Sequence, residues 1–217
     1  MATQAQVQAF LKRIAPIVQE VCKGREKWIL PSVAIAQAAC ESNWGTSKAM
    51  TAANGLFGFK VGKGVKYGNA WKGKSYSTKT KEYYSGYVTI TDNFRAYDSE
   101  RNAVIDYMDL LCSLGRYKAA VNEKDPQKCI TAIKNGGYCT SPTYINTIMS
   151  IIRTHNLTQY DVAVTGKQSS SGTSGTLYAA VAGFCNTAAE CQAFQMQLQA
   201  AGMNTQVWEV RPVKFIQ

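Results

Sequence analysis

The sequence predicts an α+β fold with a mainly helical lobe, a small β-hairpin lobe and a separate C-terminal module. Apolar residues recur at helical spacing over 3–22 and again after residue 99. Between them, residues 54–97 lose that spacing and are rich in Gly, Lys, Tyr and Thr. Residues 166–176, "GKQSSSGTSGT", have the composition of a flexible linker. We therefore expect a first domain over 1–165, a linker over 166–176 and a module over 177–217.

The first two helices have clear boundary signals. Thr3 begins a capping box for a helix over 3–22, in which Pro16 should introduce a kink and Gly24 should follow the end. A second helix begins at Pro31 and is apolar on nearly all sides, so it should be buried. We expect Gly45 to stop this second helix.

The middle segment predicts an antiparallel hairpin, and helices resume after it. "YVTITDNFRAY" (87–97) alternates like a strand, and "SYSTKTKEYYSGY" (75–87) precedes it. Later helices have start signals at Ser99, Asp125-Pro126 and Ser141-Pro142, and the second of them has a stop at Gly136. A cleft between the two lobes is the natural place for a ligand.

The composition describes a globular protein with a basic first domain. Hydrophobic residues make up 46% and charged residues 18%, and no apolar run approaches the roughly 20 residues of a membrane span. The N-terminus lacks the pattern of a signal peptide, which predicts a protein held in the cytosol without membrane insertion. The net charge is +10, and residues 60–81 hold seven lysines and no acid. This basic surface suits a polyanion, or is simply a solvated loop.

The cysteine and histidine content argues against a metal site. The seven cysteines are odd in number and form no CxxC pair, so we read them as reduced thiols. The one histidine, His155, is too few for a Cys₂His₂ site or for catalysis by two histidines. We expect neither a metal nor a cofactor.

Glu41 is the first candidate for chemistry. It ends the apolar run in "AACESNWG" (38–45), where lost solvation would raise its pKa and favour the protonated form. A carboxyl group in such a setting can act as a general acid, as it does in lysozyme, where the acid lies in an apolar pocket beside a tryptophan. The alternative is an ordinary surface Glu at a helix end.

A second carboxylate and a set of aromatic rings complete the candidate site. Glycoside cleavage usually needs a second carboxylate, and Glu82, between Lys79 and Tyr84 in the hairpin, would stay ionised beside its lysines. A surface Glu paired with lysines is the alternative. Aromatic rings stack on sugar faces, though they also stack on bases or fill cores. They include Trp44, Trp71, Tyr76, Tyr83, Tyr84, Tyr87, Tyr138 and Tyr144.

Several segments, in this order, resemble glycoside hydrolase family 73, the glucosaminidase family of bacterial autolysins, flagellar wall hydrolases and phage lysins. They are "SVAIAQAACESNWGTSKAM", "NGLFGFKVG", "TKEYYSG", "NFRAYDSERNAVIDYMDLL" and "GGYCTSPTYINTIMSIIRTHNL". The resemblance covers about residues 5–161. It implies a lysozyme-like fold and cleavage of peptidoglycan on the reducing side of N-acetylglucosamine.

The resemblance also implies roles for single residues. Glu41 matches the general acid, and Glu82 matches a second acidic residue whose role as a base varies within the family. Tyr138 matches the tyrosine of the "GYAT-P" signature, where Cys139 replaces the usual Ala without an expected effect on mechanism. The "NGLFGFK" loop makes Asn54 and Phe57 candidate supports of the cleft floor. Together with these two, the candidates for substrate binding are Trp44, Trp71 and Tyr84.

The last 41 residues resemble one half of a SPOR domain, a glycan-binding module that repeats a β-α-β pattern twice. "LYAAVAGFCNTAAECQAFQMQLQAAGMNTQVW" fits one copy, and the second copy is missing. A core of this size needs support to stay folded. We therefore expect a cell-wall-binding or dimerisation module, which would make the protein a homodimer with bivalent wall binding.

The predicted function is that of a phage endolysin, an endo-β-N-acetylglucosaminidase that acts on bacterial peptidoglycan after its release from the host cytosol at lysis. A lytic transglycosylase or muramidase on the same fold is the alternative among enzymes. A non-catalytic binder of wall polymer or nucleic acid is the alternative outside enzymes. We expect no nucleic-acid partner, because a charge count is a weak signal beside the matched motifs.

Overall fold

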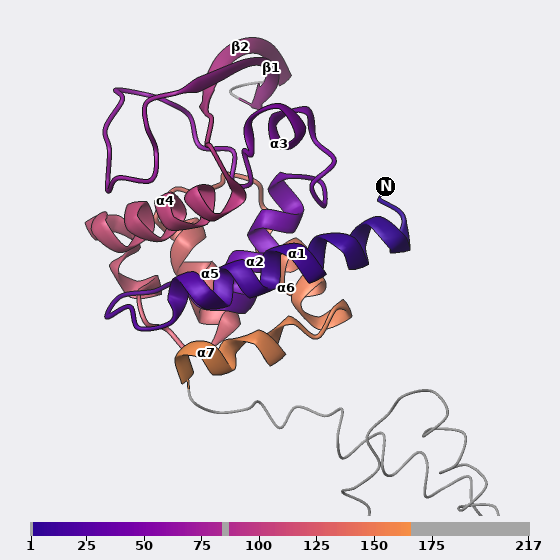
Figure 1. The fold of residues 1–217 in the computed structure, drawn as a ribbon, viewed down its shortest axis with the longest axis vertical. Coiled ribbons are helices and arrows are strands. Elements are labelled where there is room, and N and C mark those ends of the chain that lie inside the picture. The colour runs from indigo at the N-terminus through magenta and orange to yellow at the C-terminus, as the bar shows by residue number, and fades with distance from the viewer. Residues whose placement is uncertain (1, 84–86, 166–217) are drawn as a thin grey trace, which may run out of the picture. The chain divides into compact units, whose positions relative to one another are not determined.

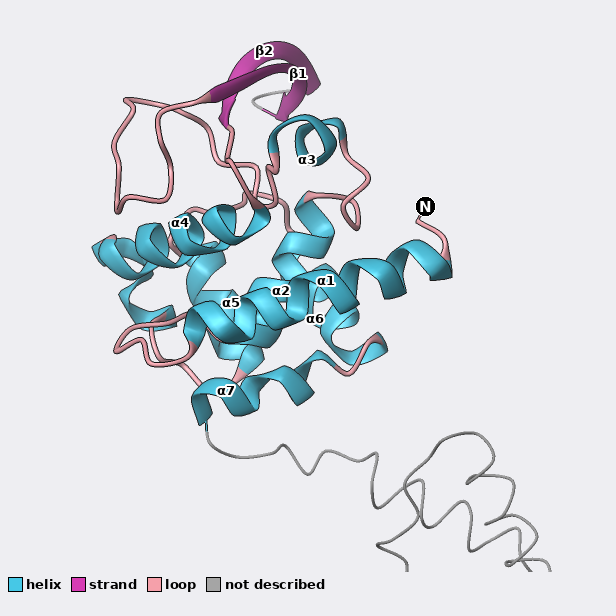
Figure 2. Ribbon diagram, in the orientation of Figure 1, coloured by secondary structure: helices cyan, strands magenta, loops and turns pink. Residues whose placement is uncertain are grey.

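A computed structural model describes residues 2–83 and 87–165, which are mostly helical with one two-stranded antiparallel sheet (Figures 1 and 2). The predicted linker and C-terminal module lie outside the described residues, as does Tyr84. No helix within the described ranges is both long and apolar enough to cross a membrane. The elements are α1 (Gln4–Cys22), α2 (Pro31–Glu41), α3 (Lys48–Ala53), β1 (Ser75–Tyr83), β2 (Tyr87–Arg95), α4 (Glu100–Ser113), η1 (Gly115–Ala120), α5 (Pro126–Asn135), α6 (Tyr144–Thr154), η2 (Leu157–Asp161) and α7 (Val162–Thr165).

Helix α2 forms the centre of the helical lobe. All of its residues from Pro31 to Ala39 are buried, and it contacts α1, α5, α6 and η2. Its sequence has no polar face, which is the pattern of a helix covered on every side. The small side chains let the neighbouring helices approach closely. This burial fixes the position of Glu41, the last residue of the helix.

Helix α1 packs on α2 through one apolar stripe. Thr3 caps it in the predicted capping box, and the helix continues through Pro16 to Cys22. Gly24 follows with a φ of +76°, a left-handed conformation that glycine adopts readily. The predicted ends of this helix are therefore confirmed to within one residue.

The end of α2 differs from the prediction that Gly45 would stop it. The helix ends four residues earlier, at Glu41, because a tight turn begins at Ser42. In this turn the Ser42 hydroxyl accepts a hydrogen bond from the backbone N–H of Gly45 (2.9 Å). Asn43, Trp44 and Gly45 all have positive φ angles, of 49°, 56° and 76°. Asparagine tolerates this left-handed region, but a bulky tryptophan in it is strained, and such strain concentrates near functional sites.

The β-hairpin lobe forms as predicted. Strands β1 and β2 pair antiparallel from Ser75 opposite Arg95 to Tyr83 opposite Tyr87. Strand β2 ends at Arg95, two residues before the predicted end. There the chain turns toward α3, and the N–H of Tyr97 donates to the carbonyl of Ala53 (2.9 Å).

The later helices begin close to their predicted caps. Ser99 and Asp125 each accept a hydrogen bond from the backbone N–H three residues further on, which confirms both starts. Helix α6 begins at Tyr144, two residues after the predicted start at Pro142. Among the described residues, Cys22, Cys40, Cys112, Cys129 and Cys139 are free thiols.

Candidate active site

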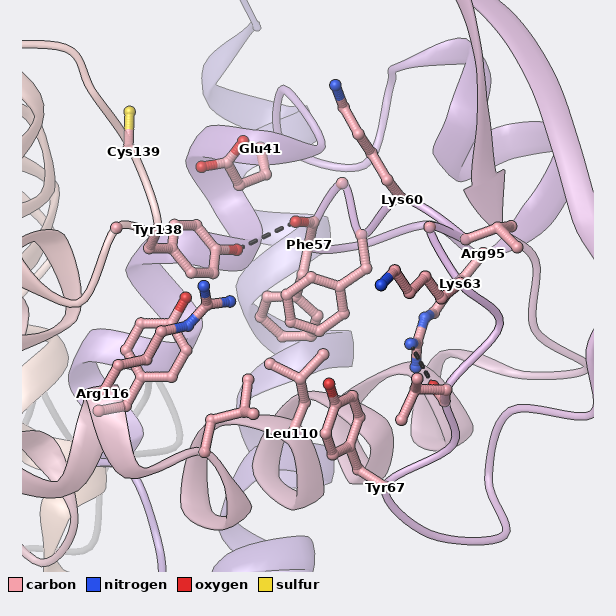
Figure 3. Close-up of a pocket in the computed structure, with 18 residues that line it drawn as sticks. Glu41, Phe57, Lys60, Lys63, Tyr67, Arg95, Leu110, Arg116, Tyr138 and Cys139 are labelled. Atoms are coloured by element: carbon pink, nitrogen blue, oxygen red, sulfur yellow. Dashed lines mark hydrogen bonds between the residues drawn. The ribbon is translucent and has the colours of Figure 1, made fainter.

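A cleft of about 710 Å³ opens beside the end of α2 (Figure 3). Its walls come from the loop after α3, the end of β2, the end of α4 with η1, and the loop before α6. The lining residues are Glu41, Phe57, Gly58, Phe59, Lys60, Val61, Gly62, Lys63, Val65, Tyr67, Arg95, Leu110, Leu114, Arg116, Tyr117, Gly137, Tyr138 and Cys139.

Glu41 presents its carboxyl group to this cleft, and its two oxygens have different surroundings. Oε1 accepts a hydrogen bond from the hydroxyl of Tyr144 (2.9 Å). Oε2 faces Gly58, where an added Cβ would lie 3.8 Å from it. The side chain reaches the solvent of the cleft, yet the aromatic walls remove much of its hydration. Burial therefore raises the pKa of Glu41, while the hydrogen bond from Tyr144 acts in the opposite direction.

Buried polar groups stand behind Glu41. The hydroxyl of Tyr144 accepts a hydrogen bond from Nε2 of Gln37 (2.9 Å), and Oε1 of Gln37 accepts one from the hydroxyl of Tyr107 (2.6 Å). Gln37 and Tyr107 are fully buried, and Tyr144 is buried as well. The three side chains come from α2, α6 and α4, so the helical core itself supports the carboxyl group.

Tyr138 lies beside Glu41 on the wall formed by the loop before α6. Its hydroxyl donates a hydrogen bond to the carbonyl of Phe57 (3.0 Å), as the dashed line in Figure 3 shows. Its ring stacks against Tyr144 and meets Phe59 edge-on, at centroid distances of 6.1 Å in both cases. Burial raises the pKa of Tyr138 well above its usual value, so it is a neutral hydrogen-bonding group at any working pH.

Phe57 and Phe59 form the aromatic floor of the cleft. The Phe57 ring is stacked on Tyr107 with centroids 4.1 Å apart, and Phe59 lies parallel to both. Flat rings at the base of an open cleft suit the apolar face of a sugar.

Basic side chains surround the cleft opening. Lys60 and Lys63 project from the β-lobe side, and Arg116 projects from η1 toward Tyr138 (Figure 3). Lys60 is paired with Asp92 (2.9 Å), and the guanidinium of Arg116 lies over the Tyr117 ring. Among the described residues, the lining therefore combines one carboxyl group with several cations, which favours an anionic ligand.

Two predicted substrate-binding residues have other contacts. Trp44 packs edge-on against Phe10 and His155, at centroid distances of 5.7 and 4.8 Å. Trp71 is buried, and its indole N–H donates to the carbonyl of Lys74 (2.8 Å). Of the four substrate-binding candidates that the structure describes, only Phe57 is among the residues that line the cleft.

Asn54 supports the cleft loop rather than the cleft surface. It ends α3 in the left-handed conformation, and its side-chain amide donates to the carbonyl of Tyr97 (2.9 Å). This contact joins the start of the loop that carries Phe57 to the chain segment after β2. The remaining candidate, Tyr84, lies outside the described residues.

Glu82 lies in β1, opposite Val88 in the hairpin register. Its side chain is outside what the structure describes, so its role as second carboxylate stays a prediction. Within residues 2–83 and 87–165, no three His, Cys, Asp or Glu side chains gather in a group that could hold a metal ion.

The sequence interpretation missed Gln37 and Arg116 as parts of the site, and it missed the contact of Tyr144 with Glu41. Gln37 carried a usable signal, because a lone amide inside an apolar helix must find a buried hydrogen-bond partner. Tyr144 is one of many aromatic residues, and nothing in its sequence surroundings indicates a contact with Glu41. Arg116 lies in a short 3₁₀ segment that has no periodic pattern.

Comparisons with known proteins agree with this architecture. The catalytic domain of the autolysin Auto from Listeria monocytogenes superposes with a TM-score of 0.61 at 33% identity, over 74% of this chain and 90% of that domain. Exo-glucosaminidase LytG of Bacillus subtilis (strain 168) is 33% identical over 139 residues, which are 61% of this chain and 46% of that protein. A probable N-acetylmuramidase of Lactococcus lactis subsp. lactis (strain IL1403) is 34% identical over 173 residues, 76% of this chain and 37% of that protein.

The family comparison covers most of the described residues. The chain spans about half the length of LytG and less of the Lactococcus protein. The likeness to the Listeria domain confirms the lysozyme-like fold that was expected for the first domain. The glucosaminidase family model, described as mannosyl-glycoprotein endo-β-N-acetylglucosaminidase, matches residues 15–157. The chain belongs to this glucosaminidase family.

Proposed function

We propose that this protein is a peptidoglycan hydrolase, an endo-β-N-acetylglucosaminidase that cleaves the β-1,4 bond between N-acetylglucosamine and N-acetylmuramic acid. The observation that carries the proposal is the carboxyl group of Glu41, which faces an aromatic cleft and has a raised pKa. A carboxyl group that holds its proton near neutral pH can act as a general acid. The name of the Listeria autolysin supports a bacterial wall as the substrate, and the name of LytG supports a glucosaminidase activity.

In this mechanism Glu41 transfers its proton to the glycosidic oxygen as the bond between that oxygen and C1 breaks. A water molecule then supplies the oxygen that replaces the leaving group at C1. Either Glu82 takes the proton of that water, or the acetamido group of the substrate attacks C1 first and water opens the resulting ring. Both routes return Glu41 to its protonated form, since the ionised carboxylate regains a proton from solvent or from the attacking water.

The cleft offers separate contacts for the sugar and for its charged substituents. Phe59, which is partly exposed, would lie under the ring of a bound sugar with the buried Phe57 packed against it, and Tyr138 would sit beside the proton donor. Lys63 and Arg116 would attract the carboxylates of the lactyl group and of the wall peptide.

The test is the variant Glu41→Gln, which keeps the shape of the side chain and removes its proton. We expect the variant to fold with an unchanged circular dichroism spectrum and to lose at least about a hundredfold in wall-clearing rate. Near-wild-type clearing would contradict the assignment of Glu41. Wild-type protein that bound walls in a steeply salt-dependent way and released no sugar ends would favour the non-catalytic alternative.

A muramidase is the second candidate, and the resemblance to the probable N-acetylmuramidase of Lactococcus favours it. Mass spectrometry of the digested wall separates the possibilities. Our proposal requires N-acetylglucosamine at the new reducing ends. N-acetylmuramic acid there would identify a muramidase, and an anhydromuramyl product would identify a lytic transglycosylase.

The role of Glu82 has its own test. If Glu82 activates water, Glu82→Ala should lose most of its activity, and azide should restore part of it by attacking C1 directly. A loss of only a few fold, without rescue by azide, would support attack by the acetamido group of the substrate.

Two further proposals concern the protein beyond the described residues. We propose that it acts as an endolysin, made in the host cytosol and released at lysis, so that its expression alone should not lyse cells until the membrane is permeabilised.

We also propose that the half-SPOR-like module pairs two chains or binds glycan. Light scattering should then give a dimer mass, and a monomer mass at working concentrations would exclude pairing.

A further inference from the structure

The hydrogen-bonded groups behind Glu41 form a chain with a single direction. Gln37 is a polar residue inside the largely apolar helix α2, and it is 0% exposed. Tyr107 from α4 and Tyr144 from α6 contact it on its two sides. Buried polar groups of this kind stay only where each has a partner, so the three side chains depend on one another.

The chemistry of an amide sets the direction of this chain. The carbonyl oxygen of Gln37 can only accept, so the hydroxyl hydrogen of Tyr107 points to it (2.6 Å). The amide nitrogen of Gln37 can only donate, and its hydrogen points to the oxygen of Tyr144 (2.9 Å). The hydroxyl hydrogen of Tyr144 is thereby left for Oε1 of Glu41 (2.9 Å).

The second carboxyl oxygen of Glu41, Oε2, faces the cleft where a substrate would bind. Oε2 of Glu41 lies toward Gly58, an exposed residue of the cleft lining with a φ of +62°. A methyl group at Gly58 would come within 3.8 Å of Oε2, so the absence of a side chain keeps the approach to this oxygen open. In Figure 3 the carboxyl group of Glu41 lies above the cleft floor, on the same side as Cys139 and Lys60.

We propose that Tyr144, oriented by Gln37 and Tyr107, is a positioning residue that holds Oε1 of Glu41 as an acceptor and so leaves Oε2 as the oxygen that carries the catalytic proton. This inference rests on the proposed role of Glu41 as general acid. The hydrogen bond also stabilises the ionised carboxylate that forms after proton transfer, since Tyr144 donates to it in either state. Burial thus raises the pKa of Glu41, and the hydrogen bond from Tyr144 lowers it.

Other titratable groups near Glu41 stay the same in the variants that test this role. They are Tyr138 and Cys139 on the loop before α6, Cys40 on α2 itself, and the cations Lys60, Lys63 and Arg116 around the cleft. A change in the acidity of Glu41 in a Tyr144 variant therefore reports the lost hydrogen bond.

The experiment measures kcat/KM against pH for the full chain acting on purified peptidoglycan, with new reducing ends as the readout. In Tyr144→Phe the carboxylate loses a donor, so its pKa rises and Glu41 stays protonated to higher pH. We expect the alkaline limb of the profile to move up by about one pH unit. We also expect kcat to fall by about tenfold with little change in KM, because the proton donor is less well placed.

Tyr97→Phe is the matched control. It too removes a buried tyrosine hydroxyl that donates to a carboxylate, in this case Oδ2 of Asp106 (2.7 Å), away from Glu41. Its alkaline limb should coincide with that of the wild type. A Tyr144→Phe variant with reduced activity and an unmoved alkaline limb would overturn the proposal.

Gln37→Met provides the second variant if Tyr144→Phe does not fold. Gln37 does not touch Glu41, so the positioning role predicts a smaller shift of the alkaline limb in the same direction, and an unmoved limb in a folded Gln37→Met variant would also overturn it. A different result would contradict the proposed function itself. If Glu41→Gln remains active, Glu41 is not the general acid. An inactive Glu41→Gln together with unmoved limbs would discard only the role of Tyr144.

Discussion

Nη1 of Arg95 lies 3.1 Å and 2.9 Å from the two carboxylate oxygens of Asp106, in an ion pair whose side chains are 4% and 1% exposed. Arg95 is the last residue of β2, and Asp106 lies in α4, so the pair joins the β-hairpin lobe to the helical lobe. Nη2 of Arg95 donates to the carbonyl of Val65 in the cleft wall (2.6 Å), and its guanidinium lies over the Trp71 ring at 4.2 Å. The same side chain therefore holds the two lobes and one wall of the cleft together.

Removal of one partner of this pair should be strongly destabilising. In Asp106→Asn the guanidinium of Arg95 keeps its burial and loses the compensating charge. We expect a loss of about 3–5 kcal/mol in the free energy of unfolding, measured by urea denaturation. The exposed pair between Lys74 and Asp98 provides the control, and Lys74→Met should cost less than about 1 kcal/mol. Equal losses in the two variants would show that the buried pair adds nothing beyond a surface contact.

Local signals explain which parts of the fold the sequence could predict. The caps at Ser99 and Asp125 and the antiparallel hairpin depend on residues close in the chain, and they form where expected. The turn after Glu41 does not depend only on residues close in the chain. The positive φ of Trp44 is compensated by packing against Phe10 and His155, which are distant in the chain. Gly45 looked like a stop signal, and it is instead the third left-handed residue of that turn.

The candidate site likewise has residues that the sequence could predict and contacts that it could not. Glu41, Tyr138 and Phe57 belong to sequence motifs, and all three line the cleft. The contact between Tyr144 and Glu41 joins residues 103 positions apart, and no local pattern reports such a contact. Trp71 looked like a sugar-stacking ring, but the cation of Arg95 occupies its face and the ring is buried. Only the fold shows which face of an aromatic ring is already covered.

Asp161 should make the stability of the protein depend on pH. Its Oδ1 accepts a hydrogen bond from the backbone N–H of Ser32 (2.7 Å), in the first turn of α2, which has no side-chain cap at Leu30. Burial raises the pKa of Asp161 to about 6. Because its folded-state pKa lies above the unfolded value, its contribution to stability is complete below about pH 4 and is lost as the pH rises through 6.

Asp161→Asn tests this dependence, because asparagine keeps an acceptor for the Ser32 N–H and cannot ionise. Urea unfolding at pH 4, 5, 6 and 7 should show the wild type losing up to about 3 kcal/mol relative to the variant as the pH rises. Parallel stability curves for the two proteins would contradict the raised pKa of Asp161.

Gly136 should not tolerate a side chain. It follows α5, and an added Cβ would lie 2.8 Å from the carbonyl oxygen of Arg116 and within 2.6 Å of Cε1 of Tyr117. Both neighbours line the cleft, so Gly136→Ala should lower the free energy of unfolding by about 1–3 kcal/mol and reduce activity as well. Gly115→Ala is the control on η1, since nothing lies within 4 Å of its Cβ position. A stable and fully active Gly136→Ala would mean that Tyr117 and Arg116 can move aside without affecting the cleft.

Cys139 should make activity sensitive to thiol reagents. It is a free, partly exposed thiol in the cleft lining, next to Tyr138. Burial and the nearby Glu41 raise the pKa of Cys40 to about 11, so Cys40 stays a poorly reactive thiol at neutral pH. An added carbamidomethyl group on Cys139 would narrow the cleft beside Glu41, the proposed proton donor. Iodoacetamide at neutral pH should therefore inactivate the wild type progressively and leave Cys139→Ala, which carries the usual residue of the family, active. Equal rates of inactivation in the two proteins would place the sensitive thiol elsewhere in the chain.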